Sequence, residues 1–230
     1  RKEGDPNYDL FQLAVKSTAV RLYPNYANCD WSGNEGYDKN DPKTFFSTMG
    51  FRTANGYDIN ADFGVNPQTK DGRGNICPVT IILPTLAMMS KGDIGNKDTE
   101  DFIEILDKKI HEAKDQLIER FEYICSQSPD SAKFMYENNI MLGYDGKDIR
   151  SALKHGTLAL GQIGLAETLQ ILIGCNHTTE EGMKLAKRIE GLFSRRCVKF
   201  KEQYKLNFGV YFTPAENLCY TAMIKFKEKY

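Results

Sequence analysis

The stretch GRGNICPVTIILP, residues 72–84, decides the fold class. Its largely β-branched apolar run extends from Ile76 to Leu83, with glycines and Asn75 before it and Pro84 after it. A short apolar run between turn residues predicts a buried strand. Strands buried on both faces are typical of α/β proteins, in which helices cover a parallel sheet.

Two long amphipathic helices are predicted further along the chain. Residues 99–126 carry apolar side chains at three- and four-residue spacing, and Asp98 and Thr99 are available as caps. A second apolar stripe covers residues 183–204, and a capping box formed by Thr178 and Glu181 precedes it. Both patterns indicate helices that bury one face.

Shorter strands and helices alternate around these two helices. Residues 156–164 predict a strand, residues 165–173 a helix that ends at a glycine, and residues 207–212 another strand. The apolar stretch 19–23, which ends before Pro24, also predicts a strand. Alternating strands and helices favour an α/β fold with a mostly parallel sheet or barrel and outer helices.

Composition excludes several classes of partner. The 230 residues are 41% hydrophobic and 27% charged, and the net charge is -1. These values are typical of one globular domain and provide no broad electrostatic footprint for nucleic acid or an anionic membrane. No apolar run reaches the ~20 residues of a membrane span, and no signal peptide is recognisable. We therefore expect a cytoplasmic protein with neither nucleic acid nor membrane as partner.

Cysteines and histidines give no metal pattern. The six cysteines include no C-x-x-C pair, and several fall on apolar faces of the predicted elements. Neither a disulfide framework nor a zinc site is indicated, so we expect no metal in this chain. His155 lacks a partner at metal-ligand spacing and is interpreted as a hydrogen-bonded packing residue.

Five segments together resemble a known family. They read STMGFRT at 47–53, GRGN at 72–75, KHGT at 154–157, GQIGLAET at 161–168 and YFTPAE at 211–216. In order, spacing and wording they resemble the anaerobic, glycyl-radical (class III) ribonucleoside-triphosphate reductases. The resemblance implies that residues 1–230 are a single partial domain, the second half of a ten-stranded α/β catalytic barrel. It also implies a central finger loop around residues 47–56.

Phe51 is the main departure from that family. At this position of the finger loop the family carries the cysteine that becomes a thiyl radical and abstracts hydrogen from the ribose. A phenylalanine ring has no equivalent S–H bond, and Cys77, the nearest thiol, belongs to the predicted strand. Two interpretations remain: a substituted active-site position, natural or engineered, or a paralogue that binds nucleotide without reducing it.

Asn75 matches the active-site asparagine of the family, and the resemblance implies that its amide holds the ribose. Without the resemblance, Gly72, Gly74 and Asn75 are explained equally well as a turn, because all three residue types tolerate positive φ. Arg52, beside Phe51, is a candidate phosphate ligand, although arginines next to loop glycines are commonly solvated.

The segment from Thr213 to Asn217 is the other candidate site. Thr213, Pro214 and Glu216 form a capping pattern for a last helix, and helix N-termini also bind phosphate. The resemblance implies that Thr213 and the backbone N–H groups of Ala215 and Asn217 bind substrate, with Glu216 beside the ribose. Both interpretations can hold at once.

The implied activity is reduction of ribonucleoside triphosphates to deoxyribonucleotides with formate as reductant. The family also uses a glycyl radical and a structural zinc, both in a C-terminal segment outside this chain, and ATP or deoxynucleotide effectors bound to a separate cone. Expected partners are the substrate, the remainder of the barrel, a second subunit and a radical-SAM activating enzyme. We expect this chain alone to be inactive. The alternatives are a non-catalytic nucleotide-binding or allosteric module and, against the wording of residues 49–53 and 72–75, a formate-lyase or dehydratase.

Overall fold

The computed structural model describes residues 2–21, 26, 36, 38, 40–44 and 55–230. The chain divides into two compact units, Arg1–Tyr37 and Asp38–Tyr230. That both belong to one partial barrel domain stays a prediction.

The first unit contains helix α1, Tyr8–Arg21, which has no buried residue. The strand predicted at residues 19–23 is wrong for residues 19–21, which form the last turn of this helix. A helix satisfies its backbone groups locally, whereas a strand needs a neighbouring strand to pair with. Arg21 in the last turn also suits the negative end of the helix dipole.

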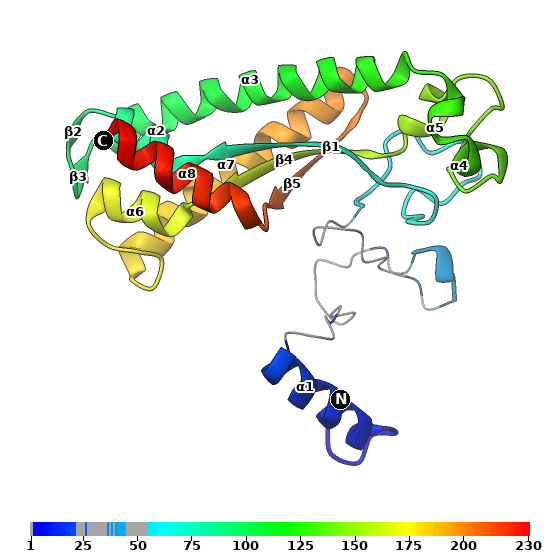
Figure 1. Ribbon diagram of the computed structural model, residues 1–230, viewed down its shortest axis with the longest axis horizontal. Helices are drawn as coiled ribbons and strands as arrows, with labels where there is room; N and C mark the ends of the chain where they lie inside the picture. Colours follow the sequence, from blue (N-terminus) through cyan, green and yellow to red (C-terminus); the bar gives the residue numbers. More distant parts are fainter. Residues whose placement is uncertain (1, 22–25, 27–35, 37, 39, 45–54) are drawn as a thin grey trace. The chain divides into compact units, whose positions relative to one another are not determined.

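A three-stranded parallel sheet forms the centre of the second unit (Figure 1). Its strands are β1, Asn75–Ile82, β4, Thr157–Ile163, and β5, Asn207–Phe212, in the order β1-β4-β5. The three strands predicted in this unit and the α/β class are therefore confirmed. Because the strands are parallel, their carboxyl ends all lie at one edge of the sheet.

Helices connect and cover the strands. The two long helices predicted from periodicity are confirmed as α3 and α7, and the short one as α6. The helical segments of this unit are α2, Leu83–Met89; α3, Thr99–Cys125; α4, Lys133–Glu137; α5, Arg150–Leu153; α6, Leu165–Ile173; α7, Glu180–Tyr204; α8, Glu216–Lys229; and the 3-10 turns Pro42–Thr44 and Pro129–Ala132. A two-residue hairpin, β2, Gly92–Asp93, and β3, Asn96–Lys97, lies between α2 and α3.

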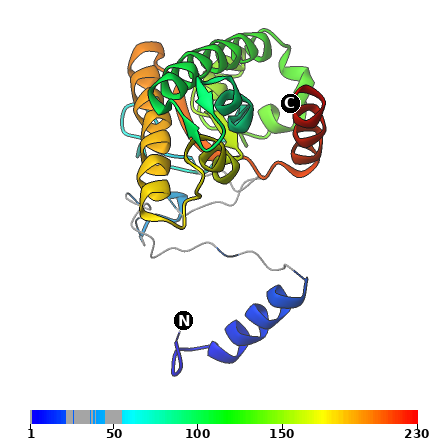
Figure 2. The same cartoon turned by 90° about the vertical axis from the view of Figure 1, so that its left-hand side faces the viewer.

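The hydrophobic core lies between the sheet and helices α3 and α7. Leu158 and Leu160 of β4 belong to one buried cluster with the apolar stripes of both helices, which the predicted 3.6-residue periodicity placed correctly. Bidentate hydrogen bonds from Arg196 to Asp107, at 2.6 and 2.5 Å, link α7 to α3 outside the core. Helix α8 lies on the opposite side of the sheet from α7 (Figures 1 and 2). The largest fully buried core side chains are Phe102, Phe121, Phe193, Phe200, Phe208, Leu83, Leu106, Ile110, Leu117, Ile149, Leu158 and Leu160.

Helix starts differ in detail from the sequence prediction. The Asp98 cap of α3 is confirmed, because its carboxylate accepts from the backbone N–H groups of Glu100 and Asp101. The Thr178 capping box is wrong: Thr179 caps α7 by accepting from the N–H of Gly182, at 3.1 Å, while Thr178 bonds to Asn176. Two adjacent threonines compete for one cap, and sequence alone does not choose between them.

The end of β1 was also placed one residue too far. Leu83 and Pro84 begin helix α2, which the sequence analysis missed. Proline is favoured in the first turn of a helix because its missing N–H would have no intrahelical partner there. Pro84 therefore starts a helix as well as ending the strand.

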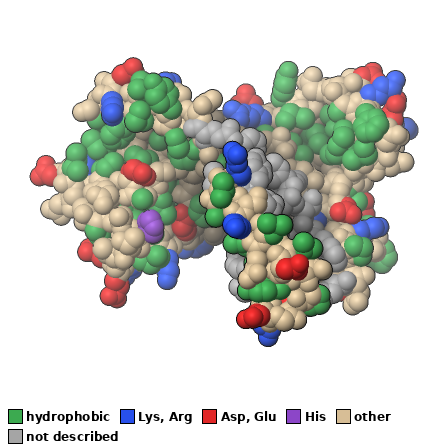
Figure 3. All heavy atoms as spheres, turned by 60° about the horizontal axis from the view of Figure 1, so that its bottom comes forward, with side chains coloured by type: hydrophobic (Ala, Val, Ile, Leu, Met, Phe, Trp, Pro, Cys, Tyr) green, Lys and Arg blue, Asp and Glu red, His purple; other side chains and the backbone are tan. Residues whose placement is uncertain are grey.

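Charged side chains of both signs are scattered over the visible face, as expected from the near-neutral net charge (Figure 3). Among the described residues, no helix is long and apolar enough to cross a membrane.

Candidate functional site

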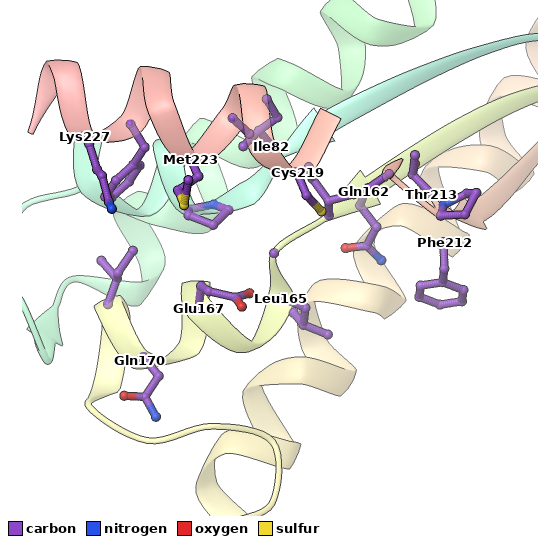
Figure 4. A pocket seen from close by; sticks show the side chains of 18 residues that line it. Ile82, Gln162, Leu165, Glu167, Gln170, Phe212, Thr213, Cys219, Met223 and Lys227 are labelled. Carbon is purple, nitrogen blue, oxygen red and sulfur yellow. The ribbon is translucent and has the colours of Figure 1, made fainter. Parts of the chain in front are cut away.

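A cavity of about 950 Å³ opens at the carboxyl edge of the sheet (Figure 4). The last residues of all three strands, Ile82, Ile163 and Phe212, line it. Helices α6 and α8 supply the rest of the wall, which is mainly apolar. In open parallel sheets, ligands bind outside the carboxyl ends of the strands. This cavity is therefore the principal candidate site.

Gln162 is the most buried polar side chain of the cavity wall, with 3% of its surface exposed. Its Nε2 donates a hydrogen bond to Oε1 of Glu190 on α7. Burial raises the pKa of Glu190, and the bond from Gln162 opposes that shift. Oε1 of Gln162 is buried and has no hydrogen-bond partner among the described residues. Sequence analysis identified the segment around Gln162 only as a predicted strand and as part of a family motif. The pattern of apolar and polar residues along a strand does not show which polar side chain faces a cavity.

Thr213 sits directly after β5 and also lines the cavity. Its hydroxyl lies 2.8 Å from that of Thr80 on β1, so the two outer strands contact each other across Gly161 of the central strand. A Cβ at Gly161 would lie 2.4 Å from Oγ1 of Thr213 and 2.9 Å from that of Thr80. Glycine is therefore required here by close approach of side chains.

Gly161→Ala is expected to lower the free energy of unfolding by about 1–3 kcal/mol, because the added methyl overpacks this contact. Urea denaturation measures the change. Gly74→Ala is the matched control, because a Cβ at that position meets no atom within 4 Å. This variant should leave the free energy of unfolding nearly unchanged or raise it. Equal losses in both variants would show that the threonine pair is not the constraint.

The start of α8 differs from the predicted capping pattern. The helix begins at Glu216, and Ala215 precedes it with φ 49 and ψ -31 and no side-chain cap. Thr213 does not cap α8, since its hydroxyl is engaged with Thr80. Pro214 likewise lies outside the helix. The chain thus turns sharply at Ala215, which lines the cavity with Thr213.

Asn75 lies at the other edge of the sheet. It begins β1, whereas Thr213 follows the end of β5, so strands of this length separate them by roughly 20 Å at ~3.3 Å per residue. Oδ1 of Asn75 is buried, and the part of the chain that the structure describes offers it no hydrogen-bond partner. The structure therefore does not bring Asn75 and Thr213 to one site.

A buried polar cluster, the amino-edge cluster of Asp58, Arg73, His155 and Asn207, lies near Asn75. Asp58 is 2.8 Å from Nδ1 of His155 through Oδ2 and accepts from Asn207 at 2.8 Å through Oδ1. Arg73 Nε donates to the backbone oxygen of His155 at 2.6 Å. The prediction that His155 is a hydrogen-bonded packing residue is confirmed, although loop spacing gave no signal for Asp58 as its partner.

Electrostatics hold Asp58 charged in this cluster. Burial alone would raise its pKa, but hydrogen bonds from His155, Asn207 and the backbone of Asn60, together with the nearby Arg73, lower the pKa below its usual value. None of the four residues of the cluster lines the large cavity. We interpret it as structural.

The remaining predicted site residues are distributed as follows. Phe51 and Arg52 lie outside the described residues. Glu216 is the first residue of α8, and Asn217, exposed on α8, does not line the cavity. Of the predicted substrate-binding residues, only Thr213 and Ala215 reach the cavity within the described chain.

Most thiols of the described chain are buried, which disfavours the thiolate form. Burial raises the pKa of Cys77 to about 11 and that of Cys197 to about 12. Cys77 packs toward α3, with its sulfur 3.7 Å from the backbone oxygen of Leu117, and not toward the cavity. Cys219, which sequence analysis did not single out, is exposed and lines the cavity. Within the described residues, no cluster of His, Cys, Asp and Glu could hold a metal ion.

The parallel sheet and the cavity at its carboxyl edge define an α/β protein with a candidate ligand site. The family model of anaerobic ribonucleoside-triphosphate reductase matches residues 1–230. The chain therefore belongs to the anaerobic ribonucleoside-triphosphate reductase family.

Curated relatives carry the same description. The chain is 31% identical to the anaerobic ribonucleoside-triphosphate reductase of Escherichia coli over 227 residues, covering 95% of this chain and 30% of the relative. The Haemophilus influenzae protein of that description is 27% identical over 230 residues, with the same coverage. The chain thus spans about a third of the length of these relatives.

Solved structures give a weaker likeness. The anaerobic ribonucleotide reductase from Thermotoga maritima with citrate in the active site has 21% identity and a TM-score of 0.48, covering 60% of this chain and 24% of that chain. The same enzyme in complex with dATP and CTP gives 23% and 0.47. The α/β class rests on the strands of the chain itself.

Proposed function

We propose that this chain is the second half of the catalytic barrel of a ribonucleoside-triphosphate reductase, and that its cavity receives the substrate. The observation that carries the proposal is the cavity at the carboxyl edge of the sheet, beside the N-terminus of α8. The first N–H groups of a helix lack intrahelical partners and favour anions. Thr213 and the backbone N–H group of Ala215 would bind substrate phosphate there. Asn217 does not line the cavity and would act only through its backbone N–H in the first turn of α8.

The proposed reaction exchanges the ribose 2′-hydroxyl for hydrogen, with formate as the reductant of the family. The proposed roles of Glu216 at the ribose and of Arg52 at phosphate rest on the YFTPAE and finger-loop motifs. Asn75 lies at the opposite edge of the sheet from the cavity, so the role that the GRGN motif implies for it is not part of this proposal. Phe51 occupies the position where the family needs a thiol, so we expect no turnover from this chain.

The complete assembly is proposed from family membership. It would include the remainder of the ten-stranded barrel, a second subunit, the radical-SAM activating enzyme and the effector cone that binds ATP or deoxynucleotides. The glycyl radical and structural zinc are proposed for a C-terminal segment outside this chain. Helix α8 leaves several large apolar side chains exposed, among them Tyr220 and Met223, which fits a surface that further protein covers.

Calorimetry with ribonucleoside triphosphates tests substrate binding. We expect the chain to bind them, and Thr213→Val to weaken binding about five- to tenfold by removing one hydroxyl contact. Thr178→Val serves as control, because it alters an exposed threonine whose hydroxyl bonds to Asn176. Absence of binding in a folded sample, confirmed by circular dichroism, would overturn the proposed site.

The alternative function is a non-catalytic nucleotide-binding or allosteric module, and Phe51 is the observation that favours it. Deoxynucleotide effectors discriminate the two in the same calorimeter. Saturable effector binding by this chain would favour the module. Binding confined to ribonucleotides would favour the barrel.

A further inference from the structure

Two lysines without an acidic partner lie beside the amino-edge cluster, away from the large cavity. Lys70 and Lys201 are half-buried, and among the described residues no carboxylate forms an ion pair with either of them. Nζ of Lys70 donates to the neutral amide oxygen of Gln68, at 3.2 Å. Taking an ammonium group partly out of water without a counter-charge is unfavourable. The two lysine charges are therefore incompletely compensated.

Arg73 adds a third positive charge next to Lys70. Nη1 of Arg73 donates to the backbone oxygen of Thr69, the residue directly before Lys70, at 2.8 Å. Nη2, which shares this end of the guanidinium, is buried and has no hydrogen-bond partner within the described chain. The end of the guanidinium that lies nearest to Lys70 is thus only partly satisfied.

Helix α7 brings Lys201 to the same edge of the sheet. Lys201 belongs to the last turn of this helix. One turn later, the backbone oxygen of Lys205 accepts from Nδ2 of Asn60 at 3.0 Å, so the end of α7 contacts the segment that carries Asp58. Lys201 and the amino-edge cluster therefore lie on the same part of the molecule.

The three positive charges act on one another. Burial, together with the charges of Arg73 and Lys201, lowers the pKa of Lys70 to about 8. Burial and the charge of Arg73 also lower the pKa of Lys201, although Cys197 and Asp58 oppose that shift. Because like charges at this range disfavour each other, an anion placed among them would be stabilised by all three.

Asp58, the one acid of the amino-edge cluster, does not balance these charges. Its Oδ1 accepts from Asn207 and from the backbone N–H of Asn60, both within 2.9 Å. Its Oδ2 lies 2.8 Å from Nδ1 of His155 and 3.9 Å from Nε of Arg73. One carboxylate against two lysines and one arginine leaves a surplus of two positive charges at this place. A dianion with several acceptor oxygens, such as phosphate, matches that surplus.

We propose that Lys70 and Lys201 bind a phosphate dianion at the amino edge of the sheet, with Arg73 adding its charge from beneath. The two ammonium groups donate to the phosphate oxygens, whereas the buried guanidinium acts through its field and does not need to touch the ion. None of the three residues lines the large cavity. This second site therefore goes beyond the proposed function and does not depend on it.

Urea denaturation near neutral pH tests the site, with sodium phosphate compared against sodium chloride of equal ionic strength. An ion that binds only the folded chain raises the ratio of folded to unfolded protein, by about tenfold in ~10 mM phosphate for a Kd of ~1 mM. Lys70→Met and Lys201→Met should each remove most of that gain. Lys187→Met replaces an exposed lysine of the same helix α7 and should keep it.

Both site variants are expected to fold. Without phosphate, each should be at least as stable as the parent, because methionine keeps the apolar stem of lysine and removes an unpaired, half-buried charge. A role of the lysines in folding alone predicts the opposite, a loss of stability that is the same in phosphate and in chloride, and that result would overturn the proposal.

Thr213→Val separates this site from the cavity. The variant should keep the gain from inorganic phosphate, because Thr213 lies at the carboxyl edge of the sheet. A gain lost in Thr213→Val and kept in both site variants would place the ion in the cavity and refute the amino-edge site. So would a parent chain that gains nothing from phosphate over chloride.

Phenyl phosphate identifies the source of the ligand in the same assay. An equal gain from this monoester would assign the site to the phosphoryl group of a larger molecule. A gain confined to inorganic phosphate would assign it to the free ion. In either case the gain must disappear in Lys70→Met and Lys201→Met for the site to stand.

Discussion

Asp58→Leu is expected to lower the free energy of unfolding by about 3–5 kcal/mol, because it leaves the buried guanidinium of Arg73 without a carboxylate. Asp58 is 3% exposed and its Oδ2 is 3.9 Å from Nε of Arg73. The substitution also removes one hydrogen-bond partner from His155 and one from Asn207. Urea denaturation followed by circular dichroism measures the loss.

Asp62→Leu is the control for this prediction. Asp62 is exposed and its ion pair with Lys154, at 3.6 Å, is solvated, so its loss should cost less than about 1 kcal/mol. Similar losses in the two variants would contradict a special role for the amino-edge cluster.

The same carboxylate predicts a pH dependence. The pKa of Asp58 is lowered in the folded chain below its ordinary value of 3.8, so folding favours the charged form. This contribution to stability is fully present above the unfolded pKa and is lost as pH falls from about 4 through the folded pKa. A series of urea titrations below about pH 5 should show a steeper loss in the parent than in Asp58→Asn, whose side chain does not titrate.

Phe51→Cys is the prediction with the largest expected effect on activity. In the full-length protein with its activating enzyme, we expect deoxynucleotide formation to rise from background to a measurable rate. The replacement supplies the S–H bond that the proposed mechanism requires and that a phenylalanine ring lacks. Production of deoxynucleotide from ribonucleoside triphosphate under anaerobic conditions is the measurement.

Phe51→Ser separates chemistry from volume in that experiment. It relieves the bulk of the ring but supplies no thiol, so it should stay inactive. Electron paramagnetic resonance reports the glycyl radical independently. A Phe51→Cys protein that carries the radical but makes no deoxynucleotide would show that Phe51 is not the sole block.

Periodicity placed the elements whose burial is regular. The stripes of α3 and α7 and the apolar runs of β1, β4 and β5 bury one predictable set of side chains each, so their patterns identified them. Residues 19–21 were misassigned because α1 buries none of its side chains. A segment without a buried face shows neither the 3.6-residue apolar period of a helix nor the two-residue period of a strand. The start of α8 was missed because Thr213 bonds to Thr80, a residue 133 positions away.

Candidate site residues were predicted less completely than the fold. Thr213 and Ala215 were identified by motif and lie at the cavity. Gln162, Glu190 and Asp58 were not singled out, since each acquires its environment from segments distant in sequence. Composition and spacing report local order, whereas an unpaired acceptor or a buried carboxylate is a property of tertiary contacts.

The amino-edge cluster also has a consequence for the rate of folding. Asp58 meets His155 across 97 positions and Asn207 across 149. Closing loops of that length costs chain entropy before the contacts compensate for it, so topologies rich in such contacts fold slowly. Because its members come from the segments before β1 and β4 and from the start of β5, we expect the cluster to form late in folding. Contacts that form late slow unfolding more than they speed folding. Loss of the cluster should therefore raise the unfolding rate more than it lowers the folding rate.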